Sequence, residues 1–156
     1  MANSQPHEQR LLLIEKVLLL KSLSIFEETP ETVLAEVAEI LEEEEFEGEK
    51  NIFHAGDIAQ CMYIIFKGSV RIHKGKHTLA VLKENDFFGE LSLLDTETRS
   101  ASATADTETL LLKIDQEPFY ELMENRIEVA KGIIKTLCRR LKAQNEKAMQ
   151  QTTPQS

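Results

Sequence analysis

The residues with the strongest chemical signal lie at positions 87–102, where a glycine, a glutamate, a short apolar run and an arginine follow one another. Gly89 lets the backbone approach an anion closely, because glycine has no Cβ atom. The run Leu91–Leu94 predicts a short helix whose free N–H groups point at that anion. Arg99 carries a guanidinium that can bind two phosphate oxygens at once. Glu90 would repel a phosphate, so we expect it to bind a sugar hydroxyl. Phosphate and ribose bound by one loop indicate a nucleotide.

Two glycine-punctuated strand patterns precede this segment, Phe53–Asp57 with Gly56 and Met62–Val70 with Gly68. With them, the order Gly-Glu-Leu and then Arg-Ser-Ala resembles the phosphate-binding cassette of the cyclic-nucleotide-binding domain family. That family includes the catabolite activator protein and the regulatory subunits of cyclic-AMP-dependent protein kinase. The resemblance runs from about Ile25 to about Lys147. It implies a cytoplasmic signal-transduction module whose ligand is cyclic AMP, with cyclic GMP as the alternative, and it implies no cofactor.

The resemblance also implies which residues form the site. The phosphate and ribose would be bound by Gly89, Glu90, Leu91, Ser92, Arg99, Ser100 and Ala101. The candidates for the base pocket are Ile72, Leu79, Gln144 and Asn145. Other roles stay open: a helix cap for Glu90, a surface position for Arg99, barrel core for Ile72 and Leu79, and a solvated helix end for Gln144 and Asn145.

The linker Asp95–Thr98 departs from the family, many of whose members have glycine or proline there. Asp95 and Glu97 could pair with Arg99 in the empty site and oppose phosphate binding. A structural or interaction domain that no longer binds nucleotide is therefore the alternative function. Retention of both Glu90 and Arg99 argues against that alternative.

Other chemistry is not expected. The chain has four histidines, and a metal site would need several of them to converge with an acid. His73 and His77 flank a Lys-Gly-Lys turn and indicate a hairpin tip instead. No serine or cysteine has a suggestive base partner, and no carboxylate pair stands out as an acid–base couple. We therefore predict no metal and no enzymatic activity.

The fold class follows from a change along the chain in the spacing of apolar residues, from helical spacing to a period of two. From Phe46 to Ile114 short β-rich runs recur with turns at glycines, namely 51–54, 62–66, 70–73, 78–82, 100–105 and 109–114. We expect a mainly β, α+β fold in one domain, residues 1–156. An antiparallel β-roll of the double-stranded jelly-roll type would span about 46–115, with the cassette helix at 87–102.

Helices are predicted on both sides of the roll. Residues 8–45 form an N-terminal helical segment in this interpretation, with Thr29 as an N-cap and the glutamate run 42–45 ending its second helix. Two helices occupy about 116–149, with disordered residues at 1–7 and 150–156. In the long helix 126–149, Ile127, Ile134, Leu141 and Ala148 repeat every seven residues. This seam packs either on the protein's own barrel or on a second chain.

Composition limits the possible partners. The net charge is −9, with 42% hydrophobic and 29% charged residues, as in an ordinary soluble globular chain. Residues 27–49 carry 11 acidic and no basic side chains, whereas 126–148 carry 7 basic and 2 acidic ones. A basic helix in so negative a field does not favour nucleic acid, and the sequence leaves little room for a DNA-reading module.

Leu11–Leu20 is too short and too charged to enter a membrane. A homodimer through 126–149 or an unknown effector protein is the expected partner. Two distant cysteines fit a reducing compartment.

Overall fold

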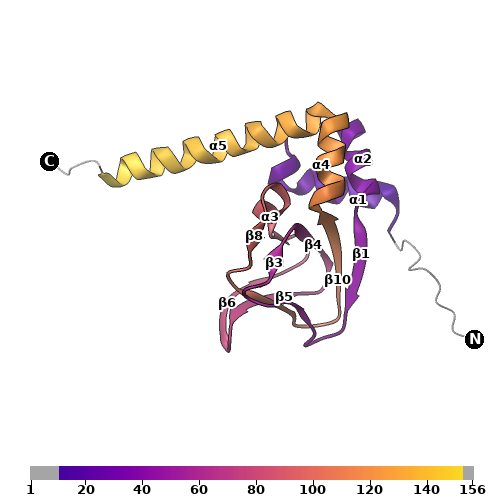
Figure 1. The fold of residues 1–156 in the computed structure, drawn as a ribbon, viewed down its shortest axis with the longest axis vertical. Coiled ribbons are helices and arrows are strands. Elements are labelled where there is room, and N and C mark those ends of the chain that lie inside the picture. The colour runs from indigo at the N-terminus through magenta and orange to yellow at the C-terminus, as the bar shows by residue number, and fades with distance from the viewer. Residues whose placement is uncertain (1–10, 153–156) are drawn as a thin grey trace, which may run out of the picture.

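The middle of the chain forms a roll of antiparallel strands, and the helices gather at one end of it (Figure 1). The computed structural model describes residues 11–152 of the chain. One sheet has the strand order β1-β10-β4-β7, the second has β2-β9-β5-β6, and β3 pairs with β8. The strands are β1 (Glu42–Phe46), β2 (Asn51–Phe53), β3 (Ile58–Ala59), β4 (Cys61–Lys67), β5 (Val70–Lys74), β6 (His77–Leu82), β7 (Phe87–Phe88), β8 (Glu97–Thr98), β9 (Ser102–Ala105) and β10 (Thr109–Asp115). The predicted fold class is therefore confirmed.

Strand β4 separates two regions of the core. Met62 and Ile64 face a cluster shared with the helices, whereas Tyr63 and Ile65 face the interior of the roll. Successive side chains of a strand point to opposite faces, so both faces of β4 are covered. This explains why its sequence reads as a nearly continuous apolar run rather than as a strict alternation.

The helices share one hydrophobic cluster with the first sheet. They are α1 (Leu13–Ser22), the 3₁₀ turn η1 (Ser24–Phe26), α2 (Glu31–Glu39), the cassette helix α3 (Glu90–Leu94), α4 (Gln116–Asn125) and α5 (Ile127–Thr152). Phe119 of α4 is fully buried and meets Phe26 of η1 edge to face, with 6.1 Å between ring centroids. The helices before and after the roll are thus joined to it through the same apolar cluster.

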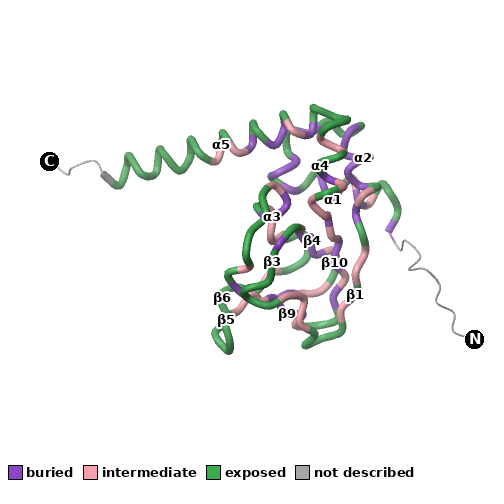
Figure 2. Tube along the Cα trace, viewed as in Figure 1, coloured by how far each residue is buried: buried purple, intermediate pink, exposed green. Residues whose placement is uncertain are grey.

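Helix α5 lies against the domain with its first half only, and its second half extends away from the roll (Figure 2). Val129, Ile133 and Thr136 are buried on its inner side. Ile127, Ile134 and Leu141 remain 58–59% exposed. The interpretation in which these seam residues pack on the protein's own barrel is therefore wrong for these three positions.

Two expectations about the N-terminal region also fail. Glu42–Glu45 belong to β1, which pairs with β10 along its whole length, so the helical segment ends before them. Pairing with a buried neighbouring strand outweighs the poor β propensity of glutamate. In addition, Nζ of Lys113 in β10 lies 3.5 Å from Oε1 of Glu44. Thr29 does not cap α2: the N-cap is Pro30, and the Thr29 hydroxyl is buried without a partner among the described residues.

The predicted disordered ends fall partly outside the described residues. Residues 1–7 and 153–156 are not described, and Gln150–Thr152 continue α5. Within the described part of the chain, no helix combines the length and the apolar character needed to cross a membrane.

Candidate functional site

Gly89 occupies the turn between β7 and the cassette helix in a left-handed conformation, with φ +79°. Side chains rarely tolerate this conformation, and glycine adopts it readily. A Cβ atom built on Gly89 would lie 2.5 Å from Nη1 of Arg99 and 3.1 Å from the carbonyl oxygen of Cys61. Both the backbone angle and the close approach of the arginine therefore require glycine here.

The backbone of Arg99 is fixed by the turn that contains Gly56. The Arg99 N–H donates to the carbonyl oxygen of Asp57 at 2.8 Å, and the Gly56 N–H donates to the Arg99 carbonyl oxygen at 2.8 Å. The turn closes through the Asp57 carboxylate, which accepts a bond from the His54 N–H at 2.9 Å. The sequence Phe53–Asp57 thus positions an arginine more than forty residues further along the chain.

The direct contacts of the Arg99 guanidinium are neutral groups. Nη1 donates to Oγ of Ser92 at 3.3 Å, and Nη2 donates to the carbonyl oxygen of Cys61 at 3.0 Å and contacts its Sγ at 3.5 Å. The ring of Phe53 lies beneath the guanidinium carbon at 4.2 Å, a cation–π contact. Within residues 11–152 Arg99 forms no ion pair. The expected pairing with Asp95 or Glu97 does not occur, so the positive charge remains available to an anion.

A cavity of about 210 Å³ lies in front of this arginine. Its walls come from β2, β5, β7, α3, β8 and the segment before β9. The lining residues are Phe53, Ile72, Phe88, Gly89, Ser92, Glu97, Thr98, Arg99, Ser100 and Ala101. The cavity therefore brings together Gly89, Ser92, Arg99, Ser100, Ala101 and Ile72 from the predicted set.

The remaining candidates lie outside this cavity. Leu91 is 51% exposed and Leu79 is 50% exposed. Gln144 and Asn145 are exposed on the half of α5 that extends away from the roll. In this structure only Ile72 of the base-pocket candidates lines the cavity.

Glu90 lies beside the cavity and is held by helix α5. Its carboxylate accepts hydrogen bonds from Nη1 of Arg140 at 2.6 Å and from Nη2 at 3.3 Å. Arg140 also donates to Oγ of Ser24 at 2.6 Å. The sequence does not point to Arg140, because fifty positions separate it from Glu90. The signal that could have indicated such a partner is that a carboxylate beside an anion-binding site needs a nearby cation.

Sequence reasoning also missed the aromatic wall. Phe53 and Phe88 line the cavity, and the Phe88 ring stacks on Tyr63 with 5.2 Å between centroids. Burial raises the pKa of Tyr63 above its usual range, so its phenol stays neutral. Phe53 belongs to the Phe53–Asp57 motif, but that motif alone does not predict that its ring lies against the arginine.

The inner side of the cassette helix is attached to α4. Nε2 of Gln116 donates to the carbonyl oxygen of Ser92 at 3.2 Å, and the Tyr120 hydroxyl donates to the carbonyl oxygen of Leu94. Two hydrogen bonds therefore connect α3 to α4.

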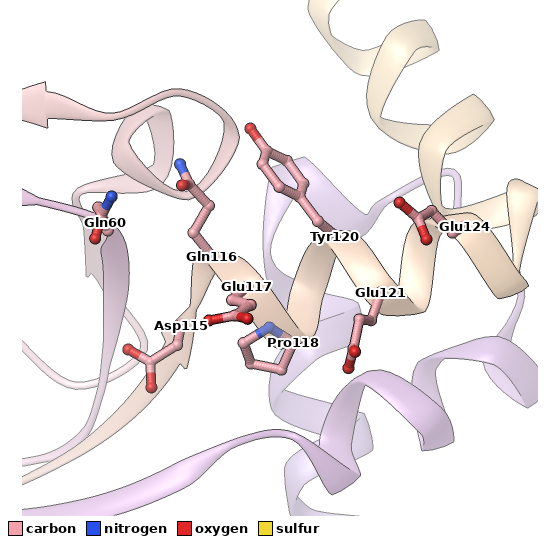
Figure 3. A pocket seen from close by; sticks show the side chains of 8 residues that line it. All are labelled: Gln60, Asp115, Gln116, Glu117, Pro118, Tyr120, Glu121 and Glu124. Carbon is pink, nitrogen blue, oxygen red and sulfur yellow. The ribbon is translucent and has the colours of Figure 1, made fainter.

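A larger cavity of about 600 Å³ lies along α4 and the end of β10 (Figure 3). Four carboxylates line it, those of Asp115, Glu117, Glu121 and Glu124. Their negative field opposes a phosphate. The smaller cavity with Arg99 therefore fits an anionic ligand better than the larger one does.

Comparison with known proteins agrees with this geometry. The model of the cyclic nucleotide-binding domain family matches residues 43–126, more than half of the chain. The chain belongs to this family. A cyclic AMP receptor protein from Thermus thermophilus is 41% identical over 98 residues, which cover 60% of this chain and 45% of that protein.

Two further relatives are regulatory proteins. A cAMP-dependent protein kinase regulatory subunit from Eremothecium gossypii is 32% identical over 112 residues, covering 71% of this chain and 23% of that protein. The crystal structure of the N-terminal domain of a transcriptional regulator from Streptomyces coelicolor A3(2) has a TM-score of 0.79 and 28% identity. That match covers 83% of this chain and 94% of the other. The chain spans less than half the length of the Thermus and Eremothecium proteins.

Replacement of Gly89 tests whether the turn and the arginine depend on each other. Gly89→Ala and Gly75→Ala both place alanine at a positive φ, and each should cost about 1–2 kcal/mol of unfolding free energy. Only the Gly89 variant meets a neighbour, because nothing lies within 4 Å of a Cβ atom on Gly75. The NMR signal of Arg99 Nε–H should therefore move in Gly89→Ala and not in Gly75→Ala. An unchanged signal in both variants would place the guanidinium elsewhere.

Proposed function

We propose that this chain is a regulatory module that binds a cyclic nucleotide, with cyclic AMP as the first candidate ligand and cyclic GMP as the second. The observation that carries the proposal is the Arg99 guanidinium, held by neutral groups against the cavity that contains Gly89. A cyclic phosphate carries one negative charge on two exocyclic oxygens, which a guanidinium binds in a bidentate manner. The names of the Thermus and Eremothecium relatives support cyclic AMP.

Glu90 is the proposed ribose-binding group. In this structure both of its oxygens accept bonds from Arg140. A ribose hydroxyl can donate to a carboxylate that already holds a guanidinium, because a carboxylate offers about four lone-pair sites. Helix α5 would then sense the ligand directly through Arg140.

Calorimetric titration with cyclic AMP and cyclic GMP tests the binding proposal. Arg99→Ala should weaken cyclic AMP binding at least about 30-fold, since losing one partner of a desolvated charge pair typically costs about 2–5 kcal/mol. Lys76→Ala serves as the control, because it removes the same charge from the exposed tip of the β5–β6 hairpin. Equal affinity of the wild type and Arg99→Ala would refute the assigned role of Arg99.

The second part of the proposal is a relay from the cassette helix to α4 and α5. Phosphate binding at Ser92 and Arg99 would move α3, and the bonds from Gln116 and Tyr120 transmit the movement to α4. A ligand shifts such an equilibrium only by binding one arrangement better than the other. The Arg140–Glu90 pair provides a second connection, directly to α5.

Hydrogen exchange measures this relay. Cyclic AMP should change the exchange rates of residues 118–148, which lie beyond the cavity, as well as those of the cassette. Arg99→Ala with the same nucleotide is the control and should show no change. Identical exchange of residues 118–148 with and without bound nucleotide would contradict the relay and leave binding intact.

The third part is the partner, for which we propose a second copy of this chain. Ile127, Ile134 and Leu141 form an exposed stripe at heptad spacing, typical of a helix that pairs with another helix. An unidentified effector protein is the other candidate for this stripe. The two differ in whether the purified chain associates alone.

Sedimentation of matched variants separates these two partners. The wild type should sediment as a dimer at micromolar concentration. The double variant Ile134→Asn with Leu141→Asn should be a monomer, because two polar side chains then replace apolar residues of the exposed stripe. Lys135→Asn with Lys142→Asn changes the next residues along the helix, off the stripe, and should leave the dimer intact. A monomeric wild type would favour the effector.

The alternative function is an interaction domain of the same fold that binds no nucleotide. The carboxylate of Glu97 in the wall of the cavity is the observation that favours it. Absence of binding heat and of thermal stabilisation by millimolar nucleotide would support it.

Catalysis is not part of the proposal, and neither is nucleic-acid binding. Among the described residues, no three or more His, Cys, Asp or Glu side chains gather in a way that could hold a metal ion. Both cysteines are free thiols, which fits the cytoplasm. The negative net charge opposes contact of the basic helix with DNA.

A further inference from the structure

The cavity contains one acidic side chain, and strand β8 places it there. Glu97 pairs through its backbone with Ala59 of β3, which fixes its position beside Arg99. Oγ of Ser92 donates to Oε2 of Glu97 at 3.5 Å and accepts from Nη1 of Arg99 at 3.3 Å. One hydroxyl therefore links the carboxylate and the guanidinium, and both charged groups border the space in which a phosphate would lie.

The two acidic residues of the linker differ in position. Both residues are exposed, but Glu97 lines the cavity and Asp95 does not. In the part of the chain that the structure describes, Glu97 forms no direct ion pair, and its connection to the Arg99 guanidinium runs through the Ser92 hydroxyl. Glu90, the other acid near the cassette, is paired with Arg140. Glu97 is thus the acidic side chain without a direct ion pair that lines the cavity in which a phosphate would lie.

The energy of repulsion between two charges is proportional to their product. A cyclic phosphate is a diester with a single negative charge. A phosphate monoester, such as 5′-AMP, carries close to two charges when the pH is well above its second pKa of about 6. The same carboxylate therefore repels the open-chain monoester about twice as strongly in free energy as the cyclic ligand.

We propose that Glu97 is a specificity-determining residue that selects monoanionic cyclic phosphates against dianionic nucleoside monophosphates. This inference rests on the proposed nucleotide site and assigns that site a way to reject the abundant open-chain nucleotides. Arg99 alone would favour the dianion, because attraction to a cation also grows with the charge of the ligand. Glu97 offsets that preference at the cost of some affinity for the cyclic nucleotide.

The test compares wild type, Glu97→Gln and Asp95→Asn, each binding cyclic AMP and 5′-AMP in competition calorimetry at about pH 8, where the monoester is a dianion. Glu97→Gln keeps the shape of the side chain and its place in the two-stranded pair with β3. If it tightens cyclic AMP binding about threefold, it should tighten 5′-AMP binding about ninefold, because doubling the ligand charge squares the factor. Asp95→Asn removes the same charge outside the cavity and should change the ratio of the two affinities by less than about twofold.

Salt provides a second readout. The gain in 5′-AMP affinity on Glu97→Gln should shrink as the ionic strength rises from about 0.01 M to 1 M, because the screening length falls from about 30 to 3 Å. A structural effect of the substitution would not depend on salt in this way.

The possible outcomes distinguish a failure of the role assigned to Glu97 from a failure of the proposed nucleotide binding. An unchanged affinity ratio in Glu97→Gln, with wild type that binds cyclic AMP, overturns the role of Glu97 alone. The same change of ratio in Asp95→Asn as in Glu97→Gln would also overturn it, because the effect would then be one of net charge. Failure of both the wild type and Glu97→Gln to bind either nucleotide would refute the proposed function and the inference with it.

Discussion

The structure depends on a cation that is kept without a counter-ion. Arg99 is half-buried, and its partners are a hydroxyl, a carbonyl oxygen, a thiol and the ring of Phe53. Burying an unpaired charge is costly, and a carboxylate would have satisfied it more strongly. Such a pair, however, would have to break before a phosphate could bind. Neutral partners hold the guanidinium in place and leave its charge available. Gly89, the Gly56 turn and the start of β4 all serve this arrangement.

The contacts that hold α5 against the domain differ from the contact that joins α5 to the cassette helix. Arg126 pairs with Glu36, and Arg139 pairs with Glu27 and Glu28, all at exposed positions. Exposed pairs of this kind contribute little stability, so the buried Val129 and Ile133 supply most of the docking energy of the helix. The pair between Arg140 and Glu90 differs because it reaches the cassette. It joins the cassette helix directly to α5.

Local patterns predicted much of this molecule, and long-range contacts explain what they missed. The period of two and the turn glycines located most strands, and the spacing of Gly89, Glu90 and Arg99 pointed to a segment whose Gly89 and Arg99 line one cavity. Strand β1 was missed because four consecutive glutamates have no strand signal of their own; only pairing with β10 makes them extended. Arg140 and Phe53 were missed because their roles arise from residues that lie 50 and 46 positions away, Glu90 and Arg99.

Ser92 shows how compactly the cassette joins binding to response. Its hydroxyl is buried between Arg99 and Glu97, at the place where phosphate charge would arrive. Its carbonyl oxygen accepts the bond from Gln116 of α4. The side chain of Ser92 therefore lines the Arg99 cavity, and its backbone bonds to α4. Helix α3 spans only five residues, and the hydroxyl and the carbonyl oxygen of Ser92 belong to the same residue of it. In the proposed relay, a single residue would therefore connect the ligand to α4.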